Sequence, residues 1–181
     1  MSLHLPGTAA EKQTAAWRQA WRTPQALFNT LNAEFNFRVD AAADRANAKL
    51  PRFWDKEANG LAKPWEGERV WCNPPYNKIG PWVDKAQTAD LAVLLVPCTF
   101  STAWARRAMA TTTEIRVFTE RVAFEEPPEL TAWREANGKR PSGPAGAPML
   151  LIFRRGWKTL EAHPTARRVA FCDKLGRLVG V

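Results

Sequence analysis

Hydrophobic and polar residues alternate along this chain with two different periods, one helical and one typical of strands. Apolar positions recur three and four residues apart over 8–21 and again over 22–35, which predicts two amphipathic helices. Short continuous apolar runs predict strands, and they cover residues 35–43, 69–72, 91–98, 114–124 and 148–155. Further helices are expected near 80–88 and 101–110, with one helical turn within 129–136.

The residues at the ends of these segments support the same division. Thr23 is a suitable N-cap for the helix within 22–35, with Pro24 at its first position, and Ser101 is a candidate cap for the helix over 101–110. Residues 125–147 are rich in proline and glycine, which indicates a long surface loop. The end of the chain predicts a β-hairpin that turns near 173–176.

Helices that alternate with strands predict one α/β domain over residues 1–181. We expect a mostly parallel sheet with helices on both faces, completed by antiparallel strands and a C-terminal hairpin. In such sheets, ligands bind beyond the carboxyl ends of the strands. Asp40, residues 73–76 and residues 97–99 all lie at the C-terminal ends of predicted strands, so we expect them to line one crevice.

Composition excludes several classes of protein. A hydrophobic fraction of 45% and nine tryptophans indicate a folded core. No apolar run approaches the roughly 18–20 residues of a membrane span, and the first residues lack the layout of a signal peptide. Three widely spaced cysteines and two histidines predict neither a disulfide framework nor a metal site. A reducing cytoplasm is the expected location.

The net charge of +8 is concentrated near the end of the chain. Residues 139–181 carry nine lysines and arginines against two acidic residues, whereas residues 1–138 are nearly balanced. Such a basic region commonly contacts nucleic acid phosphates, although it can also be an ordinary solvated surface. The candidate DNA-binding residues are Lys139, Arg140, Arg154, Arg155 and Arg121, the last of which could equally pair with a neighbouring glutamate.

Residues 69–77, RVWCNPPYN, form an unusually rigid end to a buried strand. Each proline restricts the residue before it, so Asn73 and Pro74 have little conformational freedom. The Asn73 side-chain oxygen and the Pro74 carbonyl are two acceptors, and Tyr76 adds an aromatic ring. Together they suit a planar group with an NH2, such as an adenine turned out of a duplex. A plain strand-ending turn is the alternative interpretation.

These residues also carry a resemblance to a known family. NPPY resembles the catalytic motif of S-adenosylmethionine-dependent methyltransferases that act on amino groups. Three longer blocks resemble the phage-type DNA N-6-adenine methyltransferases (Dam-like), and they are WRTPQALFNTLNAEFNFRVDAAA (21–43), NGLAKPWEGERVWCNPPYNKIGPWV (59–83) and LLVPCTFSTAW (94–104). The resemblance implies a Rossmann-like methyltransferase fold, S-adenosylmethionine as cofactor and an adenine in double-stranded DNA as substrate. It also suggests a monomer in a bacterial host, with 125–147 as a target-recognition loop.

The resemblance assigns roles by position. The corner Asn73, Pro74, Pro75 and Tyr76 would hold the target amine and stack on the base. Cofactor-binding positions would be Thr23, Pro24, Asp40, Ala41, Ala42, Asn59, Leu61 and Asn73. Asp55 and Glu57 are candidates for the acid that binds the cofactor's ribose.

Two departures from the family pattern leave other functions open. The loop after Asp40 has no glycine, and Asn59 stands where an acid is expected. One alternative is a methyltransferase acting on protein glutamine N5 or on RNA adenine, because both substrates present the same planar amine. Another is a non-catalytic DNA-binding protein on a methyltransferase scaffold.

Overall fold

The computed structural model describes residues 21–140, 143, 146–156 and 168–179. The helix expected over 8–21 therefore lies almost wholly outside the described residues. Within the described residues, no helix is both long and apolar enough to cross a bilayer.

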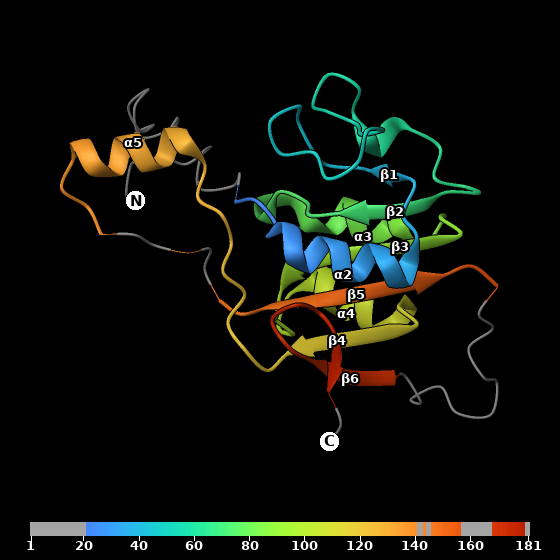
Figure 1. Ribbon diagram of the computed structural model, residues 1–181. Coiled ribbons are helices and arrows are strands. Elements are labelled where there is room, and N and C mark those ends of the chain that lie inside the picture. The colour runs from blue at the N-terminus through green and yellow to red at the C-terminus, as the bar shows by residue number, and fades with distance from the viewer. Residues whose placement is uncertain (1–20, 141–142, 144–145, 157–167, 180–181) are drawn as a thin grey trace, which may run out of the picture.

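One sheet of seven strands organises the molecule (Figure 1). Its spatial order is β1-β2-β3-β5-β4-β6-β7. The strands are β1 (Val39–Asp40), β2 (Arg69–Cys72), β3 (Leu91–Pro97), β4 (Glu114–Phe118), β5 (Pro148–Arg154), β6 (Arg168–Cys172) and β7 (Leu178–Val179). β1, β2 and β3 pair in parallel, β5 is antiparallel to both β3 and β4, and β6 is parallel to β4. Five strands therefore point one way, and only β5 and β7 oppose them.

Helices cover both faces of the sheet. On one face, α2 (Gln25–Phe35) buries Leu27, Phe28, Leu31 and Phe35 against the strands. On the other face, α3 (Ile79–Ala86) and α4 (Ala103–Thr111) pack over residues such as Leu94. Two apolar cores with the sheet between them explain why β3 is buried along almost its whole length. The predicted α/β Rossmann-like architecture is confirmed.

Several boundaries differ from the sequence predictions for local reasons. The strand expected over 35–43 shrinks to two residues, because Asn36 adopts the left-handed conformation that ends α2 (φ 47°). The strand expected over 114–124 ends at Phe118. The turn expected within 129–136 is instead a nine-residue helix, α5 (Pro128–Ala136). The hairpin turn is confirmed, since the Gly176 N–H donates to the Asp173 carbonyl at 2.9 Å.

Two predicted helix caps are shifted by one residue. Pro24 precedes α2 with extended backbone (ψ 135°), so the helix begins at Gln25 and the Thr23 side chain does not cap it. The Thr102 hydroxyl, rather than Ser101, caps α4 by accepting the Ala105 N–H at 3.3 Å. Thr23 is left buried beside a pocket described below.

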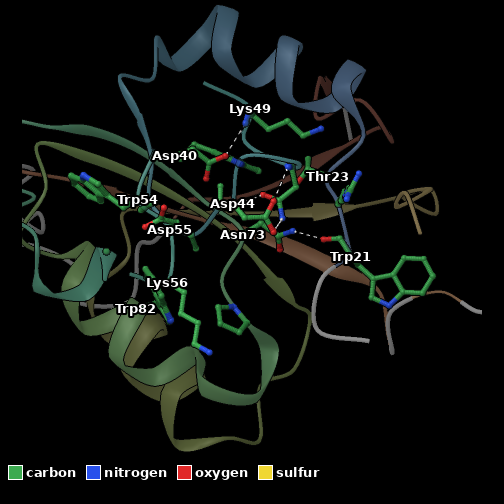
Figure 2. A pocket seen from close by; sticks show the side chains of 18 of the residues that line it. Trp21, Thr23, Asp40, Asp44, Lys49, Trp54, Asp55, Lys56, Asn73 and Trp82 are labelled. Atoms are coloured by element: carbon green, nitrogen blue, oxygen red, sulfur yellow. Dashed lines mark hydrogen bonds between the residues drawn. The ribbon is translucent and has the colours of Figure 1, made fainter. Parts of the chain in front are cut away.

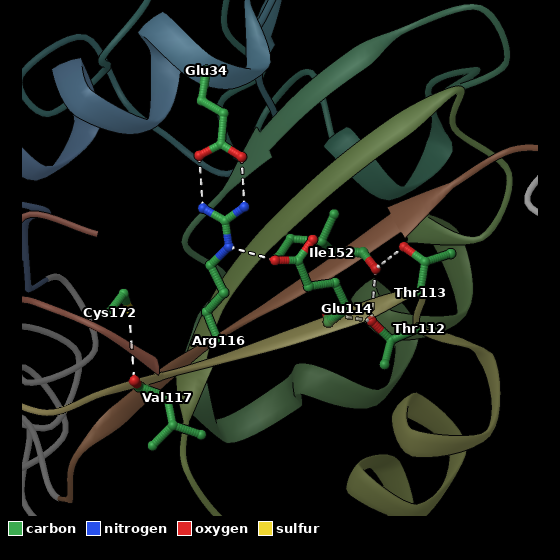
Figure 3. A network of polar contacts seen from close by, with 8 residues as sticks. All are labelled: Glu34, Thr112, Thr113, Glu114, Arg116, Val117, Ile152 and Cys172. Atoms are coloured by element: carbon green, nitrogen blue, oxygen red, sulfur yellow. Dashed lines mark hydrogen bonds and ion pairs between the residues drawn. The ribbon is translucent and has the colours of Figure 1, made fainter. Parts of the chain in front are cut away.

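A buried arginine ties α2 to β4 (Figure 3). Arg116 is only 2% exposed, and its guanidinium donates to both carboxylate oxygens of Glu34 at 2.7 and 2.5 Å. Its Nε also donates to Glu114 at 2.8 Å. The fork geometry of arginine suits this two-sided contact, which neutralises a charge that would otherwise be costly to bury. The network fixes where α2 crosses the sheet.

A long excursion between β4 and β5 stands apart from the sheet. We call residues 119–140 the α5 arm, because α5 lies within it. In Figure 1, α5 (orange) lies on the side to which β4 points, away from the helices that cover the sheet. A Glu126 carboxylate oxygen accepts from Thr131 at 2.8 Å and from Arg134 at 3.1 Å, which fixes the start of the helix.

Candidate active site

A pocket of about 430 Å³ opens at the carboxyl ends of β1 and β2 (Figure 2). Its wall comes from the residues that follow these two strands, from 21–23 before α2, and from a loop over 54–60. The volume falls within the usual range of small-molecule sites, about 300–1,000 Å³. Because β1 and β2 are parallel, their ends bring Asp40 and Asn73 to the same wall.

Asp40 is the buried acid of the pocket. It is 3% exposed, and its Oδ2 accepts the Lys49 backbone N–H at 3.0 Å. Burial raises the pKa of the Asp40 carboxyl from 3.8 to about 6, and the hydrogen bond from Lys49 opposes this rise only in part. A cationic group entering the pocket would stabilise the carboxylate, so Asp40 is suited to hold an ammonium.

The loop after Asp40 keeps its shape without glycine. The Asp44 carboxylate accepts the N–H groups of Ala46 and Asn47 at 2.8 and 3.0 Å, and the Asn47 side chain accepts the Asp44 N–H at 2.9 Å. Residues 41–43 are alanines with small side chains, and all three line the pocket. These reciprocal contacts explain how an alanine loop can replace a glycine-rich one here.

Gly60, in the loop over 54–60, is a position where the pocket requires glycine. Gly60 packs directly on the backbone of Ala41, and a Cβ at residue 60 would lie 2.2 Å from the Ala41 oxygen. The preceding Asn59 has a positive φ of 51°, which turns the chain into the short helix η1 (Gly60–Ala62). This close approach joins the loop after β1 to the loop over 54–60 and gives the pocket its depth.

Tryptophans form one side of the pocket. Trp54 and Trp82 both line it, and Trp65 lies between them with ring centroids at 6.2 and 6.3 Å. The Arg52 guanidinium covers the Trp54 ring at 5.6 Å. Such a wall offers flat apolar surface to a ring system such as adenine.

The NPPY corner stands at the edge of this pocket. The Asn73 Nδ2 donates to the Trp21 backbone carbonyl at 3.0 Å, and Figure 2 shows the Trp21 indole directed away from this contact. Cys72 is fully buried just before it, and burial raises the pKa of its thiol well above the ordinary value. A buried thiol with a raised pKa is a poor nucleophile, so Cys72 is a core residue.

Tyr76 is not among the residues that line the pocket. It begins the short helix η2 (Tyr76–Lys78), and its ring packs against the core that includes α3. Its hydroxyl is buried without a hydrogen-bond partner among the described residues, and burial raises its pKa. Stacking of Tyr76 on a base stays a prediction.

The structure brings together most of the predicted site residues and leaves others outside. Those that line the pocket are Thr23, Asp40, Ala41, Ala42, Asn59, Asn73 and Pro75. Pro24, Leu61, Pro74 and Tyr76 adjoin these residues in the chain without forming part of the wall. Of the two candidate ribose-binding acids, Asp55 lines the pocket and Glu57 does not.

The predicted DNA-binding residues fall into two groups. Arg121, Lys139 and Arg140 are exposed on the α5 arm. The arm leaves the sheet at the carboxyl end of β4, which is the end of the sheet where the pocket opens. Arg154 and Arg155 lie at the opposite end of the strands, because β5 is antiparallel to β3 and pairs Arg154 with Leu91, the first residue of β3. There Arg154 stacks on Phe35 and Arg155 pairs with Asp90 at 3.5 Å. The structure does not bring this second pair to the pocket.

Some pocket residues carried little sequence signal. Trp21, Arg22, Lys49, Trp54, Lys56, Gly60 and Trp82 all line the wall but were not assigned to it. Trp82 is both buried and part of the wall. The Asn59–Gly60 pair was the available clue, since this dipeptide commonly marks a tight turn.

Comparison with known proteins agrees with this arrangement. The family model described as DNA N-6-adenine-methyltransferase (Dam) matches residues 10–173. A DNA N-6-adenine-methyltransferase of Escherichia phage T1 is 32% identical over 106 residues, covering 55% of this chain and 44% of that protein. One from Haemophilus phage HP1 is 32% identical over 94 residues, covering 48% of this chain and 54% of that protein. The chain thus spans about half the length of these curated relatives. Because the family model extends over most of its residues, the chain belongs to the DNA N-6-adenine-methyltransferase (Dam) family.

Proposed function

We propose that this chain transfers a methyl group from S-adenosylmethionine to N6 of an adenine in DNA. The observation that carries the proposal is the Asn73 corner at the edge of a pocket whose floor holds a buried acid. The names of the family and of its two phage relatives refer to this reaction, which implies a methyl donor and a DNA substrate.

The pocket residues suit the cofactor. S-adenosylmethionine, when bound, supplies a methyl group on a sulfonium sulfur, and the amine lone pair takes this methyl as the carbon–sulfur bond breaks to leave a thioether. Asp40 would pair with the ammonium of its amino acid part, and the loop over 41–44 would follow the same part through its backbone. Trp54 and Trp82 would contact one side of the adenine ring, and the Asn59 side-chain oxygen could accept a hydrogen bond from its amine. Asp55, which lines the same pocket, would accept hydrogen bonds from the ribose hydroxyls.

The corner residues suit the substrate amine. With its NH2 bound to Trp21, the Asn73 amide offers its oxygen as an acceptor. Together with the predicted Pro74 carbonyl, this oxygen would take both N–H hydrogens of the adenine amine and turn the lone pair toward the methyl group. Catalysis would then come from positioning and from oriented dipoles. The methylated amine is cationic at first, and water suffices to accept its proton.

DNA would approach the edge of the sheet where the pocket and the α5 arm lie. Arg121, Lys139 and Arg140 are exposed there and suit contacts with backbone phosphates. Base contacts from residues 125–147 remain the expectation from the sequence.

Replacing the Asn73 amide tests the proposal directly. We expect Asn73→Ala to lower methyl transfer from labelled S-adenosylmethionine to duplex DNA by at least ~100-fold. Cofactor affinity measured by calorimetry should fall far less, because Asp40 and the tryptophan wall remain. Asn29→Ala, on the exposed face of α2, is the matched control and should keep full activity.

The same assay separates the alternatives. Transfer to RNA or to protein glutamine in preference to DNA would contradict the proposed substrate. A wild-type chain that binds no S-adenosylmethionine at millimolar concentration would contradict the enzymatic function altogether, and would favour a DNA-binding protein.

A further inference from the structure

The contact between Asn73 and Trp21 links two segments 52 residues apart. A backbone carbonyl can only accept a hydrogen bond, so the end of the Asn73 amide that faces Trp21 must be the NH2. The oxygen of the amide is thereby directed to the other side. The orientation of the side chain is set by a backbone atom of a distant residue.

The carbonyl of Trp21 is itself held in place by the α5 arm. The next residue, Arg22, exchanges two backbone hydrogen bonds with Glu125, both of 3.0 Å. The Trp21 side chain is only 9% exposed, and Thr23 on the other side is 2% exposed. The segment that carries the carbonyl is therefore fixed by packing and by this short antiparallel bridge.

We propose that the Trp21 carbonyl is a positioning group for Asn73, and that the Arg22–Glu125 bridge keeps this carbonyl in register. The inference rests on the proposed function, since the direction of the Asn73 oxygen matters only if it accepts from a substrate amine. If the amide turned over, its NH2 would face the substrate NH2, and two donors cannot bond to each other. The bridge therefore connects the arm that faces DNA to the group that holds the target base.

Replacing Asn73 by aspartate isolates the orienting contact. The carboxylate of the Asn73→Asp variant keeps two acceptor oxygens but has no donor for the Trp21 carbonyl, and an ionised oxygen would face that carbonyl near 3.0 Å. At pH 8 and saturating cofactor we expect single-turnover methyl transfer to duplex DNA to fall at least ~10-fold. The ratio of variant to wild-type rate should rise as the pH is lowered, because a protonated carboxyl regains an O–H donor. A variant that matches the wild type at every pH would overturn the inference, since acceptor oxygens alone would then suffice.

Glu125 allows a matched test of the bridge. Glu125→Pro removes the N–H that donates to the Arg22 carbonyl, whereas Glu125→Ala keeps both backbone bonds. We expect the proline variant to transfer methyl groups at least ~10-fold more slowly than the alanine variant, with the same melting temperature within a few degrees. Equal rates for the two variants would show that the bridge does not position the carbonyl.

A measurement without cofactor or DNA reports on the same contact. With asparagine labelled by ¹⁵N, the side-chain amide protons of Asn73 should exchange with solvent more slowly than those of exposed Asn29. The missing signal in Asn73→Asp identifies the resonance, and Glu125→Pro should accelerate its exchange. Exchange as fast as that of Asn29 in the wild-type chain would overturn the inference.

Failure of the inference can be told from failure of the proposed function. If the wild-type chain transfers methyl groups to DNA while both variants match their references, only the positioning role is wrong. If the wild-type chain transfers none, the proposed function is wrong, and the exchange measurement still decides whether Trp21 holds the Asn73 amide.

Discussion

The buried carboxylate of Asp40 has a cost in stability, and the proposed function gives it a binding role. Its pKa in the folded chain is about 6, above the value of 3.8 expected for the unfolded chain. Between these values the folded state holds a proton that the unfolded state has lost, so stability decreases as the pH rises through this window. Above pH 6 the folded chain keeps a buried charge, at a cost of up to roughly 3 kcal/mol. The proposed binding of the cofactor's ammonium would explain why the buried Asp40 carboxylate is tolerated.

Replacing Asp40 by asparagine should therefore separate stability from binding. We expect Asp40→Asn to gain on the order of 1–3 kcal/mol in free energy of unfolding at pH 8, and almost nothing near pH 4. The asparagine oxygen can still accept the Lys49 N–H, but it carries no charge for an ammonium. Affinity for S-adenosylmethionine should fall at least ~10-fold, and wild-type affinity should itself weaken as the pH drops below about 6. Denaturant titrations and calorimetry at both pH values check these expectations.

Asp84→Asn is the control for this change, because Asp84 is half-exposed on α3 and pairs with Arg107 at the surface. Its effect on stability should stay within about 0.5 kcal/mol, with no effect on cofactor affinity. If Asp40→Asn binds the cofactor as tightly as the wild type, Asp40 does not hold the ammonium.

At the scale of residues, the sequence predicts the two acceptors of the NPPY corner, but it does not predict which residue holds the Asn73 amide. Two consecutive prolines after Asn73 restrict the backbone by local sterics, so the rigid pair of acceptors is visible in the sequence. The partner of the Asn73 amide is a main-chain oxygen of Trp21, and every residue has such an oxygen. Nothing in the side chains of 21–23 marks it, so only the fold reveals the contact.

Among the structural elements, the two loops that meet at Gly60 determine the depth of the pocket. Gly60→Ala would place a Cβ against the Ala41 oxygen, and both contacting segments are backbone that cannot move aside cheaply. We expect a loss of roughly 1–3 kcal/mol in stability, as for other overpacked sites, together with at least a ~10-fold loss of cofactor affinity. Thermal unfolding and calorimetry on the same preparations would measure both effects.

Gly67→Ala is a control that distinguishes the effect of backbone strain from the effect of a changed pocket shape. Gly67 has a positive φ of 75°, and a Cβ there would meet nothing within 4 Å. Gly67→Ala should therefore cost about 1 kcal/mol through backbone strain and leave cofactor affinity unchanged. Unaltered affinity in both variants would mean that the Gly60–Ala41 contact does not shape the cofactor site.

Element types could be predicted along most of the chain, whereas their ends depended on tertiary contacts. The buried run of β3 and the stripe of α2 are strong local signals. The start of α2 was misplaced because Thr23 is drawn into the pocket wall instead of capping the helix. The helix α5 was underestimated because its stability depends on the Glu126–Arg134 pair and on burial of Leu130, neither of which periodicity reveals.

For the whole molecule, the direction of each strand decides which charges can serve one site. The sequence grouped Arg154 and Arg155 with Lys139 and Arg140, because a count of charges carries no direction. β5 runs against β3 over seven residues, which separates its two ends by about 20 Å. The arm and the pocket lie at the carboxyl ends of β1, β2 and β4, and the Arg154–Arg155 pair lies at the other end of these strands.

Two double variants with equal charge test this division. Lys139→Ala with Arg140→Ala removes two positive charges from the pocket edge, and Arg154→Ala with Arg155→Ala removes two from the far edge. If DNA docks over the pocket, the first variant should bind a duplex more weakly, and the slope of log affinity against log salt should fall by up to about 1.8. The second should bind as the wild type does once its folding is verified, because Arg154 also packs on Phe35. The reverse result would place DNA at the other end of the strands from Asn73, where a flipped adenine could not reach the corner.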